Sequence, residues 1–253
     1  MAFTFAHPAA VLPLQKQKNR FHFTALVLGS MAPDFEYFLF VKPFQVAGHT
    51  LAGLFTTNLP LVFIVWLIYE IFVRDPFLRY LPEPLWKGAQ QYRRAPQAIR
   101  HGREAWMFVY SALLGMLTHI VWDSFTHRSG LMVEAIPVLK QGLLIAGSQI
   151  PVYKILQHAS TLIGFFVIAW FLNEKLKVDL PPVRTRTERM MAGVYWGAVL
   201  IASGFFYIGL TLFFYHGSIG GLVMRILDSG LLGLVCISMV DRFWGTRRSG
   251  HRN

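Results

Sequence analysis

The sequence contains a single cysteine, Cys236, which lies in an apolar run. One cysteine excludes a disulfide framework within the chain and a thiolate-based metal site. The chain also lacks a Gly-rich phosphate loop, a dinucleotide-binding fingerprint and a CxxC pair, so it carries none of these nucleotide-binding or dithiol redox motifs. Charged residues are scarce as well, at 15%, which argues against an ordinary soluble domain.

Hydrophobic residues make up 54% of the chain and its mean hydropathy is +0.44, which indicates an integral membrane protein. Four apolar stretches of about 20 residues or more predict membrane-spanning helices. A fifth contains Arg225 and Asp228, which are three positions apart and can pair on one helix face. The five predicted spans are Leu51–Val73, Ala105–Trp122, Ile155–Leu172, Met191–Tyr215 and Ile219–Trp244.

The net charge of +11 is concentrated between these spans. Seven lysines and arginines lie in residues 74–103, five in residues 175–189 and four from Arg242 onward. If five spans alternate sides, these three segments share one side, and the positive-inside rule places it in the cytoplasm. Residues 1–50 and the loop 126–154 then lie outside. The basic charge is thus an orientation signal, and no nucleic-acid partner is expected.

The N-terminal region has no cleavable signal peptide, because no basic start precedes an apolar core. The segment Phe21–Val41 is apolar, but Pro33, Asp34 and Glu36 make it a poor spanning helix. We expect a buried or half-inserted helix that ends near Ala32. Lys16, Lys18 and Arg20 are expected on the outer side with the rest of this region.

These features predict an all-α polytopic membrane protein with about five transmembrane helices plus interfacial helices. Residues 86–106 mix arginines with aromatics and predict a cytoplasmic surface helix that touches anionic lipid, while residues 131–150 are expected along the outer surface. We expect one integral membrane domain over 1–253, made of an extracytoplasmic or half-inserted segment at 1–50, a transmembrane bundle at 51–244 and a cytoplasmic tail at 245–253.

The run His119-Ile-Val-Trp-Asp123-Ser-Phe-Thr-His127 places two histidines and an aspartate at four-residue steps near the end of a predicted span. On an α-helix such steps return to nearly the same face, so the three side chains form one polar stripe. Imidazole and carboxylate groups in this arrangement can bind a metal ion. The alternative is a buried structural triad, which gains little over apolar packing.

The predicted topology brings further polar residues to the same outer face. His49 precedes the first span and His158 begins the third, while His7, Asp34 and Glu36 lie in the outer N-terminal region. Taken singly, His49 or His158 can be an interfacial or hydrogen-bonded histidine, Asp34 a turn or cap residue and Glu36 a solvated carboxylate. The remaining histidines have no such partners in the sequence; they are His22, His101, His216 and His251.

The ligand types define the chemistry. Imidazole with carboxylate suits a divalent metal, zinc first and Mn²⁺ or Fe²⁺ as alternatives. There are more ligands than one tetrahedral ion needs, so two ions are expected, with three as the alternative. Clustered ions that share a bridging carboxylate generate hydroxide and hold both oxygens of a phosphoester displacement. The reaction class is metal-assisted hydrolysis, with phosphoesters ahead of amides.

Several strings carry a family resemblance: Phe5-Ala6-His7-Pro8-Ala9-Ala10, the segment Gly29-Ser30-Met31-Ala32-Pro33-Asp34-Phe35-Glu36-Tyr37-Phe38, His49, and His119-x3-Asp123-x2-Thr126-His127. They look like the bacterial membrane family called domain of unknown function 4184, over most of the chain. That family resembles predicted membrane-bound metal-dependent hydrolases and, more remotely, the all-helical zinc-dependent phospholipase C and P1 nuclease superfamily.

The resemblance implies a ligand set. His49, His119, Asp123 and Asp34 would hold one ion, His7 with Asp123 as a bridge a second, and His127 with His158 a third. Asp34 would handle the attacking water. The soluble enzymes also use an N-terminal tryptophan, which this chain lacks, and an acidic residue four positions after the last histidine, where this chain has Leu162. Two ions are therefore expected.

We thus expect a hydrolase in a bacterial inner membrane, with its site on the extracytoplasmic side and a lipid or envelope phosphoester as substrate. Membrane lipids are its expected partners. The alternative is a non-enzymatic, metal-stabilised membrane scaffold or accessory protein. An enzyme requires an open coordination position, whereas a scaffold fills every position with protein.

Overall fold

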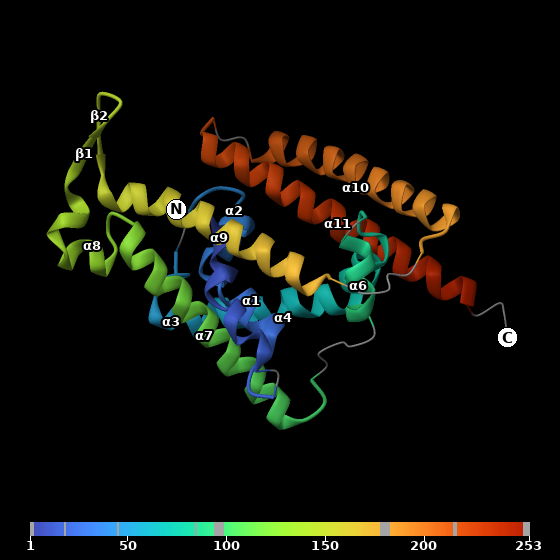
Figure 1. The fold of residues 1–253 in the computed structure, drawn as a ribbon. Helices are drawn as coiled ribbons and strands as arrows, with labels where there is room; N and C mark the ends of the chain where they lie inside the picture. The colour runs from blue at the N-terminus through green and yellow to red at the C-terminus, as the bar shows by residue number, and fades with distance from the viewer. Residues whose placement is uncertain are drawn as a thin grey trace. The chain divides into compact units, whose positions relative to one another are not determined.

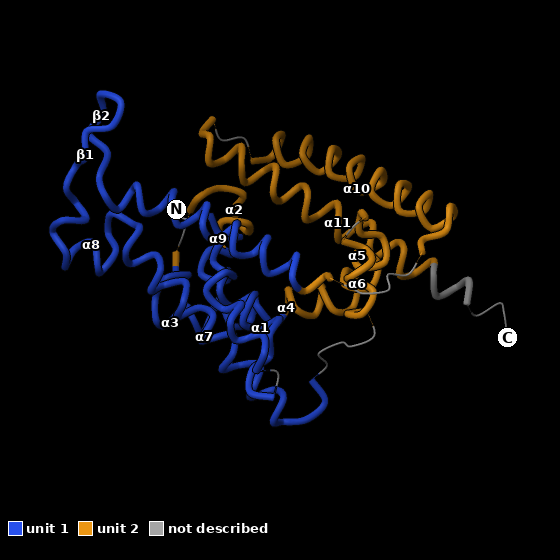
Figure 2. Tube along the Cα trace, viewed as in Figure 1, with its two compact units in different colours: residues 1–35, 47–63, 97–174 blue, residues 36–46, 64–96, 175–253 orange. Residues whose placement is uncertain are grey.

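The computed structural model describes residues 3–17, 19–44, 46–83, 85–93, 99–177, 183–214 and 217–249, the last five by their backbone alone (Figure 1). The chain divides into two compact units, each made of three separate stretches (Figure 2). Unit 1 comprises Met1–Phe35, Ala47–Phe63 and Gln97–Glu174, and unit 2 comprises Glu36–Val46, Ile64–Pro96 and Lys175–Asn253. The single domain and its proposed subdivision remain a prediction.

Five helices are long and apolar enough to cross a membrane, as the sequence predicts: Leu51–Tyr80, Gly102–Ala135, Val152–Lys175, Arg186–Phe213 and Ile219–Trp244. Each contains one predicted span, apart from Phe214, which follows the helix as its C-cap, and Tyr215, which lies outside the described residues. Large apolar side chains along them are exposed, such as Phe166 at 72% and Phe205 at 72%. Such surfaces are suited to lipid and not to water.

The first span is not a uniform α-helix. It consists of α3 (Leu51–Gly53), the π-helical turn η4 (Leu54–Asn58), α4 (Leu59–Ile68), a second π turn η5 (Tyr69–Val73) and α5 (Arg74–Tyr80). Pro60 has no N–H to donate, so the regular hydrogen-bond ladder is interrupted just before it. The wider turn at η4 accommodates that interruption.

Unit 1 is built around α7 (Gly102–Thr126) and α9 (Val152–Lys175). Its N-terminal part contains the 3₁₀ helices η1 (Thr4–Ala10), η2 (Leu12–Lys16) and η3 (Ala32–Asp34), with α1 (Phe23–Gly29) between the last two. After α7 follow α8 (Leu131–Ala135), η6 (Pro137–Lys140) and the antiparallel strands β1 (Gly142–Ile145) and β2 (Ser148–Pro151).

The β1–β2 hairpin departs from the predicted all-α fold. Gly142 pairs with Pro151 and Ile145 with Ser148, around a two-residue turn at Ala146-Gly147. Both turn residues have positive φ, 49° and 81°, as a type I′ hairpin turn requires. The sequence signal for this hairpin is Gly147, which follows the apolar run of β1.

Residues 3–34 form an N-terminal hairpin that runs along α7 and back. The His22 amide donates to Ser111 Oγ at 3.0 Å, and eight residues later the Ser30 carbonyl contacts His119. The returning helix α1 is therefore parallel to α7. In the first half of the hairpin, the Phe3 amide donates to Thr161 Oγ1 of α9 at 3.2 Å.

The turn of this hairpin lies at the amino-terminal end of α7, where Tyr110 donates its hydroxyl to the Arg20 carbonyl and Phe21 packs edge-on against Tyr110. The placement of Lys16 and Arg20 on the side of His119 and Asp123 is therefore wrong, because the segment runs the length of α7 before it turns. From residue 103 to residue 123 the helix rises about 30 Å. Lys18 lies outside the described residues.

Unit 2 contains α2 (Phe35–Phe40), α5, α6 (Leu85–Arg93), α10 (Arg186–Phe213) and α11 (Ile219–Ser249). Helices α10 and α11 pack together, and the Tyr195 hydroxyl bonds Ser238 Oγ at 2.7 Å. Arg225 and Asp228 are buried, and Arg225 donates to the Phe214 carbonyl at 3.4 Å. Their mutual pairing remains a prediction.

The predicted surface helix over residues 86–106 is wrong. Helix α6 ends at Arg93, and Trp106 belongs to α7. Trp86 and Ala89 are buried in a small core with Leu81, and Arg93 pairs with Asp75 at 2.9 Å. The arginine is thus used to hold α6 on α5. Residues 94–98, with Arg94, lie outside the described residues.

Helices α1 and α7 approach each other through two glycines. A Cβ at Gly29 would lie 2.2 Å from the Ala112 carbonyl oxygen, and one at Gly115 would lie 2.4 Å from the Leu26 carbonyl oxygen. Neither carbonyl can move without moving its helix, so only glycine fits at both positions.

We predict that Gly115→Ala lowers thermal stability in detergent, because the displaced α1 costs about 1–3 kcal/mol, more than the helix propensity of alanine returns. Gly193→Ala on α10 is the control, since nothing lies within 4 Å of its Cβ position, and it should be neutral or stabilising. Equal melting temperatures for wild type and Gly115→Ala would contradict the close packing.

Candidate metal centre

Unit 1 gathers six of the seven predicted ligands at the carboxyl-terminal end of α7. The stripe on α7 provides three of them, η1 and η3 provide His7 and Asp34 from the two ends of the N-terminal hairpin, and the loop before α3 provides His49. Four separate stretches of sequence therefore meet at one place.

Asp34, His49, His119 and Asp123 each offer one ligand atom, and these atoms all lie within 4.8 Å of one another. His119 Nε2 is 3.3 Å from Asp123 Oδ2 and 3.6 Å from Asp34 Oδ1, and His49 Nε2 is 3.4 Å from Asp123 Oδ2. Ligands about 2.0–2.1 Å from a tetrahedral ion are about 3.3–3.5 Å apart. The spacing fits a single divalent metal ion.

The floor of this cluster is buried, and four of its polar atoms have no hydrogen-bond partner among the described residues. His119 is fully buried, and His7 and Asp34 are each 1% exposed. The atoms without partners are His7 Nδ1 and Nε2, Asp34 Oδ1 and His119 Nε2. A buried polar atom left unpaired costs about 1–3 kcal/mol, and a metal ion that binds Asp34 Oδ1, His119 Nε2 or one of the His7 nitrogens would remove that cost for the atom that it binds.

Two groups that the sequence did not identify orient these ligands. His119 Nδ1 lies 2.8 Å from the Ser30 carbonyl oxygen, and donation to it leaves the Nε2 lone pair aimed at the cluster. The Thr4 hydroxyl donates to Asp34 Oδ2 at 2.6 Å, so Oδ1 is left for the cluster. A backbone carbonyl leaves no mark in the sequence, and a lone threonine is too common to single out.

Asn58 supports His49 in a similar way. It is fully buried in η4, and its Nδ2 donates to the Gly48 carbonyl at 2.7 Å, which fixes the loop that bears His49. A polar residue in an otherwise apolar predicted span was the available signal for this role.

Asp123 has histidines on both of its oxygens. Oδ2 faces His49 and His119, whereas Oδ1 lies 3.6 Å from His7 Nε2 and 3.4 Å from His127 Nδ1. The His7 ring stacks on that of His119, with centroids 3.8 Å apart. Burial, with His119 as a neighbour, lowers the pKa of His7 to about 3. His7 is therefore neutral at pH 7, the state in which imidazole binds metals.

The cluster has one exposed edge. The His49 side chain is 30% exposed and the His127 side chain 27%, in contrast to the buried His7, Asp34 and His119. The arrangement therefore has a closed floor and a side that a small molecule can approach.

The structure places His158 outside this cluster. Its side chain is exposed on α9, whereas the preceding Gln157 is buried, because successive residues point about 100° apart around a helix. Glu36 is also buried, in place of the solvated alternative, and accepts from the Val46 amide at 2.7 Å within unit 2.

Two of the remaining histidines have structural roles. His22 caps α1 by accepting from the Ala25 amide at 3.2 Å, and His101 is the cap residue before α7. His216 and His251 lie outside the described residues.

We predict that the purified protein retains a divalent transition metal and that His119→Ala or Asp123→Ala removes most of it. His158→Ala is the matched control and should keep the metal, since its side chain is exposed and is not part of the described group of four close ligands. Elemental analysis measures both, and acidification should release the metal because the imidazoles must be neutral to bind. Normal metal content in His119→Ala would show that the cluster is structural.

No curated protein and no solved structure matches this chain. The sequence matches the family described as domain of unknown function (DUF4184) over residues 1–239. That range includes every residue of the cluster and all but the end of α11, so the family resemblance of the motifs is confirmed. The chain belongs to the DUF4184 family.

Proposed function

We propose that this protein is a metal-dependent phosphoester hydrolase of a bacterial inner membrane. The observation that carries the proposal is that Asp123 has histidines at both carboxylate oxygens. Oδ2 faces His49 and His119, and Oδ1 faces His7 and His127. A carboxylate with imidazoles on both oxygens is suited to bridge two ions. Zinc is the metal that this ligand set favours, with Mn²⁺ or Fe²⁺ as alternatives.

When bound, such ions would activate a water and neutralise the charge of a phosphoester. Asp34 can serve as the proton acceptor, because Thr4 occupies Oδ2 and leaves Oδ1 directed at the cluster. Its burial keeps bulk water away from that oxygen. The exposed edge at His49 and His127 gives the substrate its approach.

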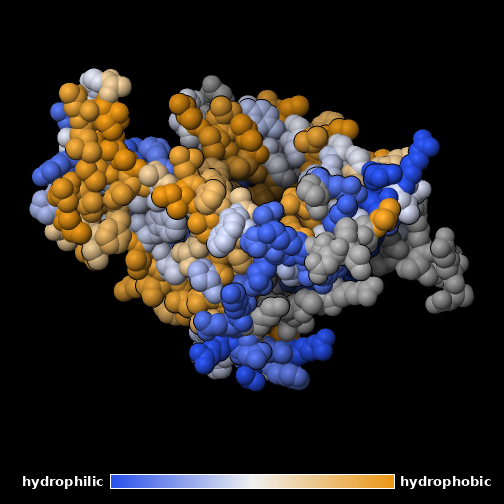
Figure 3. Space-filling model, viewed as in Figure 1, coloured by the Kyte–Doolittle hydropathy of each residue, from blue (hydrophilic) through white to orange (hydrophobic). Residues whose placement is uncertain are grey.

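A lipid or envelope phosphoester is the substrate class that the surroundings favour. The segment that follows α7 beyond the cluster presents exposed apolar side chains, with Leu131 73%, Leu144 72% and Val138 51% exposed. Figure 3 shows this end of unit 1 as a largely hydrophobic surface. Apolar surface beside a polar site is expected where a site opens at the depth of lipid headgroups.

The charge distribution supports an extracytoplasmic site. Lys16, Arg20 and Arg103 lie at the end of α7 opposite to the cluster, which adds two cations to the side already assigned to the cytoplasm. The positive-inside rule then leaves the cluster on the outer side. The remote similarity to zinc-dependent phospholipases C and P1 nucleases belongs to the same proposal.

The second candidate is a metal-stabilised scaffold, and the burial of His7, Asp34 and His119 favours it. An ion held by these residues would tie both ends of the N-terminal hairpin to α7. The enzyme remains the better fit because two histidines of the cluster are partly exposed.

The hydrolase is tested by Asp34→Asn, which keeps the shape of the side chain and removes its charge and basicity. We predict a fall in phosphodiesterase and phospholipid hydrolysis by about 10²–10⁴-fold, the usual effect of losing a positioned base. Glu134→Gln is the control: it makes the same change at an exposed carboxylate whose partner is Lys140, and its activity should equal wild type.

Metal content is measured on the same samples. If Asp34→Asn loses activity and keeps metal, Asp34 is the base; if both are lost, it is primarily a ligand. A metal-loaded wild-type protein that hydrolyses no phospholipid, lipid phosphate or generic phosphodiester would refute the hydrolase and leave the scaffold.

Orientation is tested with a reporter enzyme that is active only outside the cytoplasm. We predict activity for a fusion after Ser129, at the end of α7 that bears the cluster, and none after Arg186, at the start of α10. The opposite pattern would place the cluster in the cytoplasm.

A further inference from the structure

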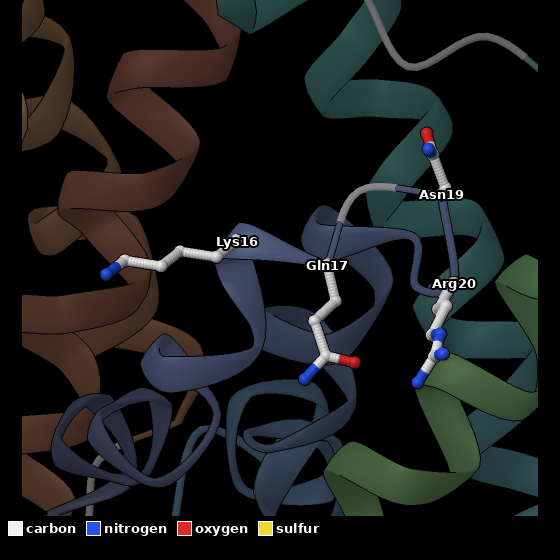
Figure 4. Close-up of a pocket in the computed structure, with 4 residues that line it drawn as sticks. All are labelled: Lys16, Gln17, Asn19 and Arg20. Carbon is white, nitrogen blue, oxygen red and sulfur yellow. The ribbon is translucent and has the colours of Figure 1, made fainter.

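The turn of the N-terminal hairpin, at the far end of α7 from the metal centre, has a second group of polar residues. Figure 4 shows Lys16, Gln17, Asn19 and Arg20 around this turn, with Lys16 and Arg20 projecting from its two sides. All four are exposed. They line a hollow that adjoins two others. The second hollow shares Asn19 and Arg20 with the first, and the third shares Asn19 and Arg103 with the second.

The central hollow is amphipathic. Its volume is about 650 Å³, and Arg20 and Arg103 with Asn19 form one part of its lining. The other part consists of Phe21, Trp106, Met107 and Tyr110. Trp106 is 70% exposed and Tyr110 41%, although both are large aromatic residues on the first turns of a membrane helix. Aromatic rings in this position are typical of the boundary between headgroups and acyl chains.

The described residues that line the three hollows carry a net positive charge, from Lys16, Arg20 and Arg103 against Glu104. Among the described residues, no acidic side chain forms an ion pair with Lys16, Arg20 or Arg103. The one acidic residue that lines the three hollows is Glu104, and its Oε2 accepts the amides of Arg100 and His101 at the start of α7. Its carboxylate is thus committed to capping that helix.

We propose that this turn is a binding site for an anionic phospholipid. Arg20 and Arg103 would contact the phosphate, and the upper acyl chain would lie against Trp106 and Met107. The positive charge favours an anionic ligand. The adjoining side chains of Trp106, Met107 and Tyr110 are apolar, so they favour a lipid over free phosphate. Figure 3 shows hydrophilic residues gathered at this end of unit 1, with hydrophobic surface above them.

The position of the site along α7 is consistent with one leaflet of a bilayer. Residues 103 and 123 are separated by about 30 Å along the helix, which equals the thickness of the hydrocarbon core. The metal centre and the lipid site would therefore lie at opposite membrane surfaces. The lipid site is independent of the proposed hydrolysis, because it shares no residue with the cluster.

The experiment is native mass spectrometry of the detergent-purified protein with added phosphatidylglycerol or phosphatidylcholine. We expect wild type to retain phosphatidylglycerol in preference to phosphatidylcholine. Each surface cation contributes about one kcal/mol to anionic lipid binding, so Arg20→Gln/Arg103→Gln should weaken phosphatidylglycerol binding by about 30-fold. The control Arg186→Gln/Arg189→Gln removes two exposed arginines from the start of α10 and should retain wild-type binding.

Three results separate the possibilities. Equal binding of phosphatidylglycerol by both double variants would overturn the site, as would equal binding of the two lipids by wild type. Displacement of phosphatidylglycerol by millimolar inorganic phosphate would overturn the lipid in favour of a small anion.

The metal content of Arg20→Gln/Arg103→Gln is measured alongside, and wild-type metal content shows that the variant is folded. Should that variant lose its metal, Trp106→Gln, which keeps every cation, is expected to reduce binding, and unchanged binding would refute the proposal.

Discussion

The structure depends on a set of buried ligand atoms that have no hydrogen-bond partner within the part of the chain that the structure describes. His7, Asp34 and His119 present four such atoms at the carboxyl-terminal end of α7, within a region of the chain that is otherwise apolar. Left alone, each atom would destabilise the fold by an amount comparable to a lost hydrogen bond. A divalent cation would satisfy Asp34 Oδ1, His119 Nε2 and one of the two His7 nitrogens, and the 3.3–3.6 Å spacing of the surrounding ligands fits such an ion.

The same requirement explains the unusual course of the N-terminal hairpin. The hairpin begins at the cluster with His7, runs to the other end of α7, and returns to the cluster with Asp34. Gly29 and Gly115 allow its returning helix to lie directly on α7. The two ends of the hairpin are thus joined through the cluster, and its turn is left to present Lys16 and Arg20 at the opposite end.

Much of this arrangement can be predicted from sequence, and the parts that cannot share a physical cause. Four-residue spacing identifies His119, Asp123 and His127, because helical periodicity is local. Alternation of the spans brings His7, Asp34 and His49 to the same end. His158 stays a prediction as a ligand, because its side chain is exposed on α9 and hydropathy gives no information on how a helix is rotated about its axis. Lys16 and Arg20 are misplaced, because a hairpin that crosses the protein without forming a long helix leaves no hydropathy signal. The orienting roles of Thr4 and Ser30 depend on tertiary contacts alone, whereas Asn58 stands out only as a polar residue within a predicted span.

X-ray absorption spectroscopy of the purified protein tests the central claim most directly, because it identifies the metal and its neighbours without assuming an activity. The account predicts nitrogen and oxygen neighbours at about 2.0–2.2 Å, with the multiple scattering of coordinated imidazole. That imidazole signal should weaken in His49→Ala, whose ligand lies at the exposed edge. A metal surrounded by sulfur, or by oxygen with no imidazole contribution, would contradict the account, and so would a protein that binds no metal.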